Sequence, residues 1–143
     1  LDNMGAVMEN KNIVDPEEVR RFLSLCCPDS LAIGIGNAHG YYKGEPDIHL
    51  EVLKAVRDFT HIPLVLHGCT GMREDIIKEA IKLGVAKINF GTEIRYKYVE
   101  HYEEGLKTMN HQGHSWKLSQ FANEKLQEDV KKIIRLAGSD NKA

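Results

Sequence analysis

Residues 31–40 read LAIGIGNAHG, a short apolar run that ends in a glycine-rich loop containing a histidine. The run from 31 to 36 shows no polar alternation, so it is predicted to form a strand buried on both faces. The same pattern recurs in IPLVLHGCTG at residues 62–71 and in VAKINFGTE at residues 85–93. We therefore expect three strands, at residues 31–36, 62–66 and 85–90, each followed by a loop of polar and small residues.

Amphipathic segments precede, separate and follow these runs. The first begins at Asp15-Pro16-Glu17-Glu18, where Asp15 suits the N-cap and Pro16 the first helical position. Further helices are predicted at residues 47–60, 72–83, 92–109 and 115–136. Gly84 suits the position just after the helix at 72–83. Strands that alternate with helices predict a parallel sheet with crossover helices. Residues 1–7 are a weaker candidate for one more strand.

The sheet belongs either to an open doubly wound fold or to a (β/α)8 barrel. A complete barrel takes about 250 residues, or roughly 30 for each βα unit. The 143 residues of this chain hold about four such units. This arithmetic favours an α/β fold that is half of a TIM barrel, with residues 1–143 as a single segment. An independent open sheet is the alternative.

Composition excludes several classes of function. The formal net charge is −2, and no basic excess points to nucleic acid or to an anionic membrane. No apolar run approaches the roughly 20 residues that span a bilayer. The three cysteines lack the even number and spacing of a disulfide framework, which favours a reducing compartment and a cytoplasmic location. The adjacent Cys26 and Cys27 are expected to be small buried apolar residues.

Two histidines stand at equivalent places after consecutive strands. His39 and His67 lie 28 positions apart, about one βα unit, and each precedes a glycine. Neutral imidazole is a common ligand of catalytic zinc, so both rings are candidates for one metal site. On spacing alone, two hydrogen-bonded structural histidines are an equally good interpretation. The remaining histidines are expected to be solvated and inert; they are His49, His61, His101, His111 and His114.

Two of the loops have the composition of a phosphate site. Residues 68–71 and 91–92 contain glycine and threonine and precede predicted helices, whose N-termini offer free N–H groups. Thr70, Asn89 and Thr92 add side-chain donors, although ordinary turns and N-caps use the same residue types. The loop at residues 41–46 is expected either to cover a bound substrate or to be simply solvated.

At these segments the chain resembles the class II ketose-bisphosphate aldolases, the fructose- and tagatose-bisphosphate aldolase family. GNAHGYYKG at residues 36–44 is similar to the family's Gly-x-x-His-Gly segment and its mobile loop. PLVLHGCTG at 63–71 is similar to its second histidine motif, and KINFGTE at 87–93 to its phosphate motif on the last strand. The resemblance runs in order from about Pro16 to the end of the chain, where residues 134–139 resemble the family's closing helix.

The resemblance implies a C-terminal half-barrel, about strands 5–8 with the C-terminal helices, and a glycolytic type of reaction. A ketose 1,6-bisphosphate would be cleaved to dihydroxyacetone phosphate and an aldehyde, with Zn²⁺ as Lewis acid. His39 and His67 would be zinc ligands, and backbone carbonyls near Gly40 and Gly68 would bind Na⁺ or K⁺. The residues implied to hold the phosphate are Gly40, Gly68, Thr70, Asn89 and Thr92. The ending Thr92-Glu93 looks closer to the tagatose-type and broad ketose-bisphosphate branch than to the long fructose-bisphosphate branch.

The sequence also departs from the family. The third zinc histidine and the catalytic Asp beside it are expected in an N-terminal half, because no Asp-x-His or Asp-His pair of that kind occurs here. Cys69 stands where relatives often have Gly, Ala or Ser. The chain is therefore expected to be a fragment, a split subunit or a degenerate product that needs a complementary half-barrel or self-pairing, within a homo-oligomer. The alternatives are a non-catalytic sugar-phosphate-binding half-barrel and another barrel enzyme, such as a metal-dependent hydrolase.

Overall fold

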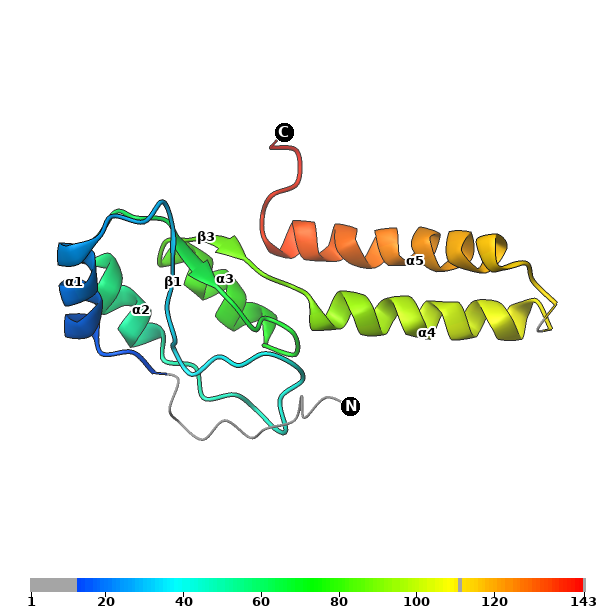
Figure 1. Ribbon diagram of the computed structural model, residues 1–143, viewed down its shortest axis with the longest axis horizontal. Helices are drawn as coiled ribbons and strands as arrows, with labels where there is room; N and C mark the ends of the chain where they lie inside the picture. The colour runs from blue at the N-terminus through cyan, green and yellow to red at the C-terminus, as the bar shows by residue number, and fades with distance from the viewer. Residues whose placement is uncertain (1–12, 111, 143) are drawn as a thin grey trace. The chain divides into compact units, whose positions relative to one another are not determined.

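The computed structural model describes residues 13–110 and 112–142, so the weak strand candidate at residues 1–7 lies outside the described residues. Contacts along the chain divide it into two units, Leu1–Phe90 and Gly91–Ala143 (Figure 1). The first unit holds the sheet, and the second holds two long helices. In the described part of the chain, every helix is too short or too polar to cross a membrane.

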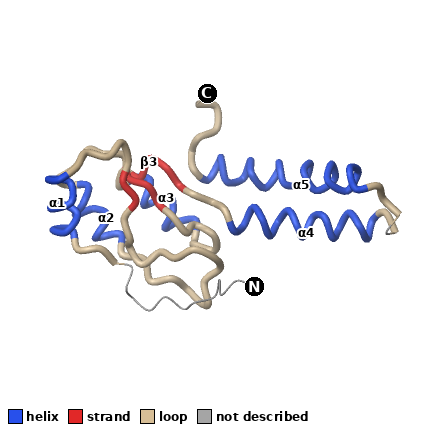
Figure 2. Tube along the Cα trace, viewed as in Figure 1, coloured by secondary structure: helices blue, strands red, loops and turns tan. Residues whose placement is uncertain are grey.

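A parallel sheet of three short strands forms the centre of the first unit. The strands are β1 (Leu31–Ala32), β2 (Leu64–Leu66) and β3 (Val85–Ile88), and β2 pairs with both neighbours. The pairing is parallel throughout, as the alternation of strands and helices predicts. Figure 2 shows how little of this unit is strand and how much is loop. Long loops therefore follow the strand ends where the candidate site residues lie.

The predicted burial on both faces holds for one strand only. All three residues of β2 are buried, because this strand lies between the other two. In the run at 31–36 Ile33 and Ile35 are buried but Ala32 is exposed, and in β3 both Ala86 and Lys87 are exposed. The prediction was wrong for these two strands. Both lie at an edge of the three-stranded sheet, and β2 is the only strand that pairs with them among the described residues, although Ile35 also forms an isolated bridge with Ile13.

Three helices, α1 (Pro16–Leu25), α2 (Leu50–Arg57) and α3 (Glu74–Lys82), complete the first unit. Asp15 caps α1 as predicted, since its side chain accepts a hydrogen bond from the Glu17 N–H at 2.9 Å. Gly84 follows α3 with a φ of +101°, a conformation that favours glycine. The helix α2 is shorter than predicted, because the His49 N–H donates to the Ile35 carbonyl at 2.8 Å and ties the preceding segment to the end of the first strand.

Side chains from the helices and the middle strand form the core of the first unit. The largest fully buried apolar residues come from α2, α3, β2 and the loops after β1 and β2; they are Ile35, Leu53, Val56, Leu64, Leu66, Cys69 and Ile77. Cys26 and Cys27, by contrast, are exposed, so the expectation that they are buried was wrong. The reason is that α1 ends at Leu25 and buries the side that carries Val19, which leaves the following residues outside the core.

The second unit is a helical hairpin of α4 (Thr92–Thr108) and α5 (Ser115–Leu136), with bounds close to those predicted. The two helices lie side by side and antiparallel (Figure 1). Gly105 is buried between them, and a Cβ at this position would lie 3.0 Å from a ring carbon of Phe121. The glycine therefore lets the helix backbones approach, while Leu118 and Ala122 are buried on the facing side of α5.

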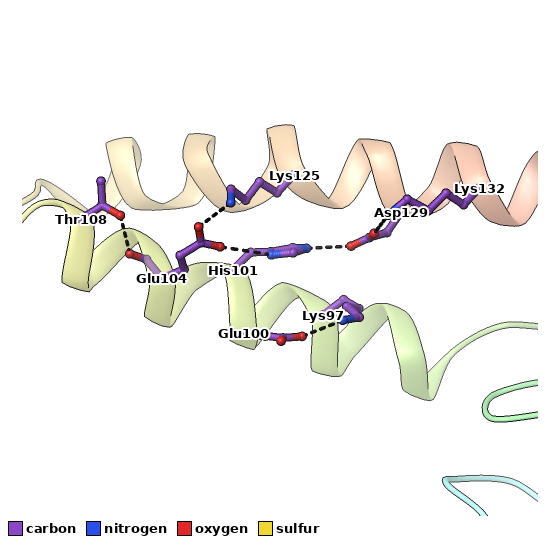
Figure 3. A network of polar contacts seen from close by, with 8 residues as sticks. All are labelled: Lys97, Glu100, His101, Glu104, Thr108, Lys125, Asp129 and Lys132. Atoms are coloured by element: carbon purple, nitrogen blue, oxygen red, sulfur yellow. Dashed lines mark hydrogen bonds and ion pairs between the residues drawn. The ribbon is translucent and has the colours of Figure 1, made fainter.

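A polar network crosses the hairpin (Figure 3). His101 on α4 lies 2.7 Å from an Asp129 carboxylate oxygen on α5, and the His101 side chain is only 14 % exposed. Lys132 donates to the other carboxylate oxygen at 2.8 Å. The expectation of a solvated histidine was wrong for His101, because α5 packs over it.

The other histidines outside the candidate site differ among themselves. His61 and His114 are exposed, as expected. His49 is partly buried, and its Nδ1 lies 2.7 Å from a carboxylate oxygen of Glu51. The partner of His49 in this contact is therefore a carboxylate and not another histidine. His111 lies outside the described residues.

We expect Asp129→Asn to lower the stability of the hairpin at pH 7 by about 1 kcal/mol or less. Hydrogen bonds from Lys132, and secondly from His101, lower the pKa of Asp129. The carboxylate therefore stabilises the fold above the pKa of an unfolded aspartate, near 4, and that contribution is lost as the pH falls through the lower folded value. Urea unfolding at pH 7 and pH 3 should show the difference between variant and parent shrinking at the lower pH.

The control for this prediction is Glu128→Gln, which removes an exposed carboxylate whose partner, Lys131, lies on the same helix. This change should cost less at pH 7 than Asp129→Asn, because no contact between the two helices is lost. An equal loss in both variants would show that the cross-helix contact contributes nothing measurable.

Candidate functional site

The two loops that follow β1 and β2 bring the predicted metal ligands together. His67 comes directly after β2, and His39 lies in the loop that follows the first strand. The centroids of the two imidazole rings are 5.4 Å apart, and the rings meet edge to face with an interplanar angle of 66°. His39 is exposed and His67 is partly buried, so the pair lies at the surface of the first unit.

Asn37 connects the two histidine loops through its side-chain amide. Its Oδ1 accepts from the Ile35 N–H at 2.8 Å, and its Nδ2 donates to the His67 carbonyl oxygen at 2.9 Å. The side chain is buried, where an amide is stable only if it is hydrogen-bonded. The sequence analysis assigned no role to Asn37, although a polar residue at the end of an apolar run was a signal for one.

Tyr42 makes a second connection between the same loops. Its hydroxyl accepts from the Ala38 N–H at 3.2 Å and donates to the Gly68 carbonyl oxygen at 2.7 Å. Burial raises the pKa of the Tyr42 phenol, so the hydroxyl keeps its donor proton in the neutral range. The sequence offered only a general signal here, an aromatic residue in a polar loop.

Backbone geometry at Gly68 sets how closely the loops approach. Its φ of +65° is in the left-handed region, and a Cβ at this position would lie 2.2 Å from the Ala38 carbonyl oxygen. No other residue type fits without moving the neighbouring backbone. Gly40 also has a positive φ, +98°, and is buried.

The rest of the second histidine loop faces inward. Cys69 and Thr70 are almost fully buried, with exposed fractions of 1 % and 2 %. The Cys69 thiol contacts the Leu66 carbonyl oxygen at 3.6 Å, and burial raises its pKa to about 11. Cys69 therefore stays a neutral thiol that fills space in the core.

Asn89 reaches His67 from the third strand. Its N–H donates to the Leu66 carbonyl oxygen at 3.0 Å, and its side-chain Nδ2 lies 3.1 Å from His67 Nδ1. The donor and acceptor roles in this contact depend on the tautomer of the His67 ring. One predicted phosphate residue thus contacts one predicted metal ligand. Thr92, the other polar residue of this segment, begins α4 in the second unit.

The loop at residues 41–46 lies against the second histidine loop. A Cβ on Gly71 would lie 3.6 and 3.7 Å from ring carbons of Tyr41 and Tyr42, which is ordinary contact distance. Farther along, Glu45 accepts a hydrogen bond at 2.6 Å from Arg73, the N-cap residue of α3. The loop is therefore held at both its beginning and its end.

The described residues bring two predicted metal ligands, His39 and His67, together at this site. Among residues 13–110 and 112–142, no group of three or more His, Cys, Asp or Glu side chains is arranged to hold a metal ion. A catalytic zinc site usually has three protein ligands and one open position. The pair of His39 and His67 fits part of such a site.

The fold and the site together define a parallel α/β protein with histidines at the carboxyl ends of neighbouring strands. A family model described as fructose-bisphosphate aldolase class-II matches residues 2–142. The chain belongs to the class II fructose-bisphosphate aldolase family. A curated relative, the uncharacterized protein YdjI of Escherichia coli strain K12, is 40 % identical over 129 residues, which cover 90 % of this chain and 45 % of the relative.

The chain is also similar to solved structures of aldolases. The YdjI aldolase from Escherichia coli K12 matches with a TM-score of 0.77 and 37 % identity, over 91 % of this chain and 46 % of that one. A putative fructose-1,6-biphosphate aldolase from Coccidioides immitis matches with a TM-score of 0.79 and 26 % identity, over 91 % and 45 %. The fructose-bisphosphate aldolase of Campylobacter jejuni shares the fold, with a TM-score of 0.77, 22 % identity and coverage of 99 % and 50 %.

These matches confirm the predicted fold class, because the chain is similar to about half of each barrel aldolase. The chain spans about half the length of the curated relative it matches. The three strands of the described residues are parallel and joined by helices.

We expect Gly68→Ala to destabilise the first unit by about 1–3 kcal/mol beyond the cost of the positive φ, because the new Cβ collides with the Ala38 backbone. Gly44→Ala is the matched control. Its φ is +118°, and a Cβ there would meet nothing within 4 Å. Chemical unfolding followed by circular dichroism measures both losses. Equal losses would show that the close approach of the loops is not a constraint.

Proposed function

We propose that this chain supplies two zinc ligands and the phosphate-binding loops of a class II aldolase. The enzyme would cleave a ketose 1,6-bisphosphate to dihydroxyacetone phosphate and an aldehyde. The observation that supports this most is the 5.4 Å separation of the His39 and His67 rings at the carboxyl ends of neighbouring strands. In parallel α/β folds these strand ends are where ligands bind.

The residues present fit a divalent metal ion. Both imidazoles lie at one place, and Asn89 and Asn37 hold His67 through its ring nitrogen and its carbonyl oxygen. A metal-binding histidine usually donates its other ring N–H to an acceptor, so His67 binding zinc through Nε2 would present its Nδ1–H to the amide oxygen of Asn89. A zinc ion bound by His39 and His67 would supply Lewis acidity to the substrate carbonyl.

The chain's own residues would bind and orient the phosphate end of the substrate. We assign this role to Gly40, Gly68, Thr70, Asn89 and Thr92. Glycine permits a ligand to approach the backbone, and the loops at residues 68–71 and 91–92 lead toward the starts of α3 and α4. The N–H groups at those helix starts attract an anion.

A monovalent cation bound by carbonyls near Gly40 and Gly68 fits less well. The Gly68 carbonyl oxygen already accepts the Tyr42 hydroxyl at 2.7 Å. A carbonyl oxygen has two lone pairs, so this hydrogen bond leaves one acceptor position at Gly68 for a cation.

The third ligand and the general acid–base Asp would come from a complementary N-terminal half-barrel. An apolar groove of about 300 Å³ runs between α1 and β1, lined mainly by Val14, Val19, Phe22, Leu31 and Ile33. Phe22 beside it is 48 % exposed. Because the curated relative has more than half its length outside the match, we propose that the corresponding part of a barrel covers this groove and the edge of β1.

A direct test replaces His67 by Ala in this chain assembled with the complementary segment. Zinc content should fall close to zero, and release of dihydroxyacetone phosphate from fructose or tagatose 1,6-bisphosphate should drop by more than the roughly 100-fold typical of lost outer-sphere groups. His61→Ala removes an exposed histidine and is the control. Unchanged zinc content in the His67 variant would refute the ligand assignment.

The same assay separates the alternative function. Zinc and phosphate binding without turnover of either sugar would favour a sugar-phosphate-binding half-barrel that has lost catalysis. Activity on substrates without phosphate, and none on the sugar bisphosphates, would favour another class of barrel enzyme, such as a metal-dependent hydrolase.

The proposed partner surface predicts a loss of association in Phe22→Glu. The part of YdjI that this chain does not match is a suitable probe, and sedimentation velocity measures the complex. We expect at least about a tenfold weaker complex, because a carboxylate would be buried in an apolar groove. Val99→Glu changes an exposed apolar residue on α4 and should have no effect. A concentration-dependent homodimer that forms without the probe would instead indicate self-pairing.

A further inference from the structure

We infer that Tyr42 is a positioning residue, whose hydroxyl fixes the spacing between the loop that carries His39 and the loop that carries His67. The role in metal binding rests on the proposed function, whereas the role in loop spacing does not. Tyr42 is not among the residues that the sequence assigned to metal or phosphate.

The hydroxyl contacts one backbone group from each loop. Ala38, whose N–H donates to Tyr42 at 3.2 Å, immediately precedes His39. Gly68, whose carbonyl accepts from Tyr42 at 2.7 Å, immediately follows His67. One oxygen atom therefore connects the residue before His39 to the residue after His67. The hydroxyl accepts one of these hydrogen bonds and donates the other.

Removing this oxygen leaves two polar groups without a partner that the structure provides. A phenylalanine at position 42 would keep the ring beside Gly71 but would leave the Ala38 N–H and the Gly68 carbonyl without the hydroxyl. A buried polar group that loses its hydrogen bond is costly, so the two loops should shift apart to admit water.

The contact acts together with a second tie and with a steric limit. Asn37 joins the first loop to the His67 carbonyl at 2.9 Å. Ala38 approaches Gly68 so closely that a Cβ would be 2.2 Å from its carbonyl oxygen. The glycine permits the approach, Asn37 holds one side of it and the Tyr42 hydroxyl holds the other. The ring separation of 5.4 Å depends on all three.

The loop also has an independent anchor that does not explain the role of Tyr42. Glu45 and Arg73 form an ion pair at 2.6 Å, with both side chains more than half exposed. Exposed pairs of this kind contribute little to stability. The spacing of the histidines should therefore respond to Tyr42→Phe and hardly at all to Glu45→Gln.

The first test is amide exchange and histidine ring NMR on this chain. In the parent, the Ala38 amide should be protected; an unprotected Ala38 amide would overturn the inference without any variant. In Tyr42→Phe, its exchange should accelerate about fivefold or more, the factor that one net hydrogen bond contributes. The ring-proton shifts of His39 and His67 should move as their edge-to-face contact changes. Tyr98→Phe removes a phenol hydroxyl from α4 and should leave both readouts unchanged.

The second test measures zinc affinity of this chain assembled with the complementary segment. Tyr42→Phe should weaken zinc binding by about 10- to 100-fold, the range for groups that orient metal ligands. The inference fails if the NMR readouts do not move in Tyr42→Phe, whether or not zinc binds. If the parent assembly takes up no zinc while the readouts move, the proposed function fails and the positioning role stands.

Discussion

The close approach of two loops at Gly68 is the constraint on which the site depends. A Cβ there would lie 2.2 Å from the Ala38 carbonyl oxygen, so only glycine lets the backbones meet. Once they meet, Asn37 and Tyr42 hydrogen-bond across the contact. The histidine pair follows from this arrangement, because His67 is bonded to Gly68 and His39 follows Ala38. Gly68 allows the two backbones to approach, and the hydrogen bonds of Asn37 and Tyr42 fix their separation.

The same region shows how one loop divides its residues between core and site. Cys69 turns inward and is almost fully buried, and its thiol contacts the Leu66 carbonyl oxygen, which anchors the loop to the middle strand. His67 stays partly exposed beside Asn89, where it can contact a ligand. In parallel α/β proteins ligands bind at such strand ends, and a rigid strand end leaves the side chains it carries little freedom to move.

Local signals in the sequence predicted the helices well. Asp15 caps α1 and Gly84 follows α3 because capping and left-handed turns depend on residues near one another in the chain. Burial was predicted less well, since it depends on which elements pack from elsewhere. Cys26 and Cys27 were predicted to be core residues but lie beyond the end of α1. His101 was predicted to be a surface residue but is covered by α5.

The sequence by itself determined the α/β class, the order of the elements and the two histidines after consecutive strands, because hydrophobic periodicity and caps are properties of short segments. The tertiary structure alone decided that the His39 and His67 rings come within 5.4 Å, and that Asn37, Tyr42 and Asn89 hold them there. Those contacts join residues on different strands or loops. Their distances depend on how the strands pair and how closely the loops pack, and no short stretch of sequence contains that information.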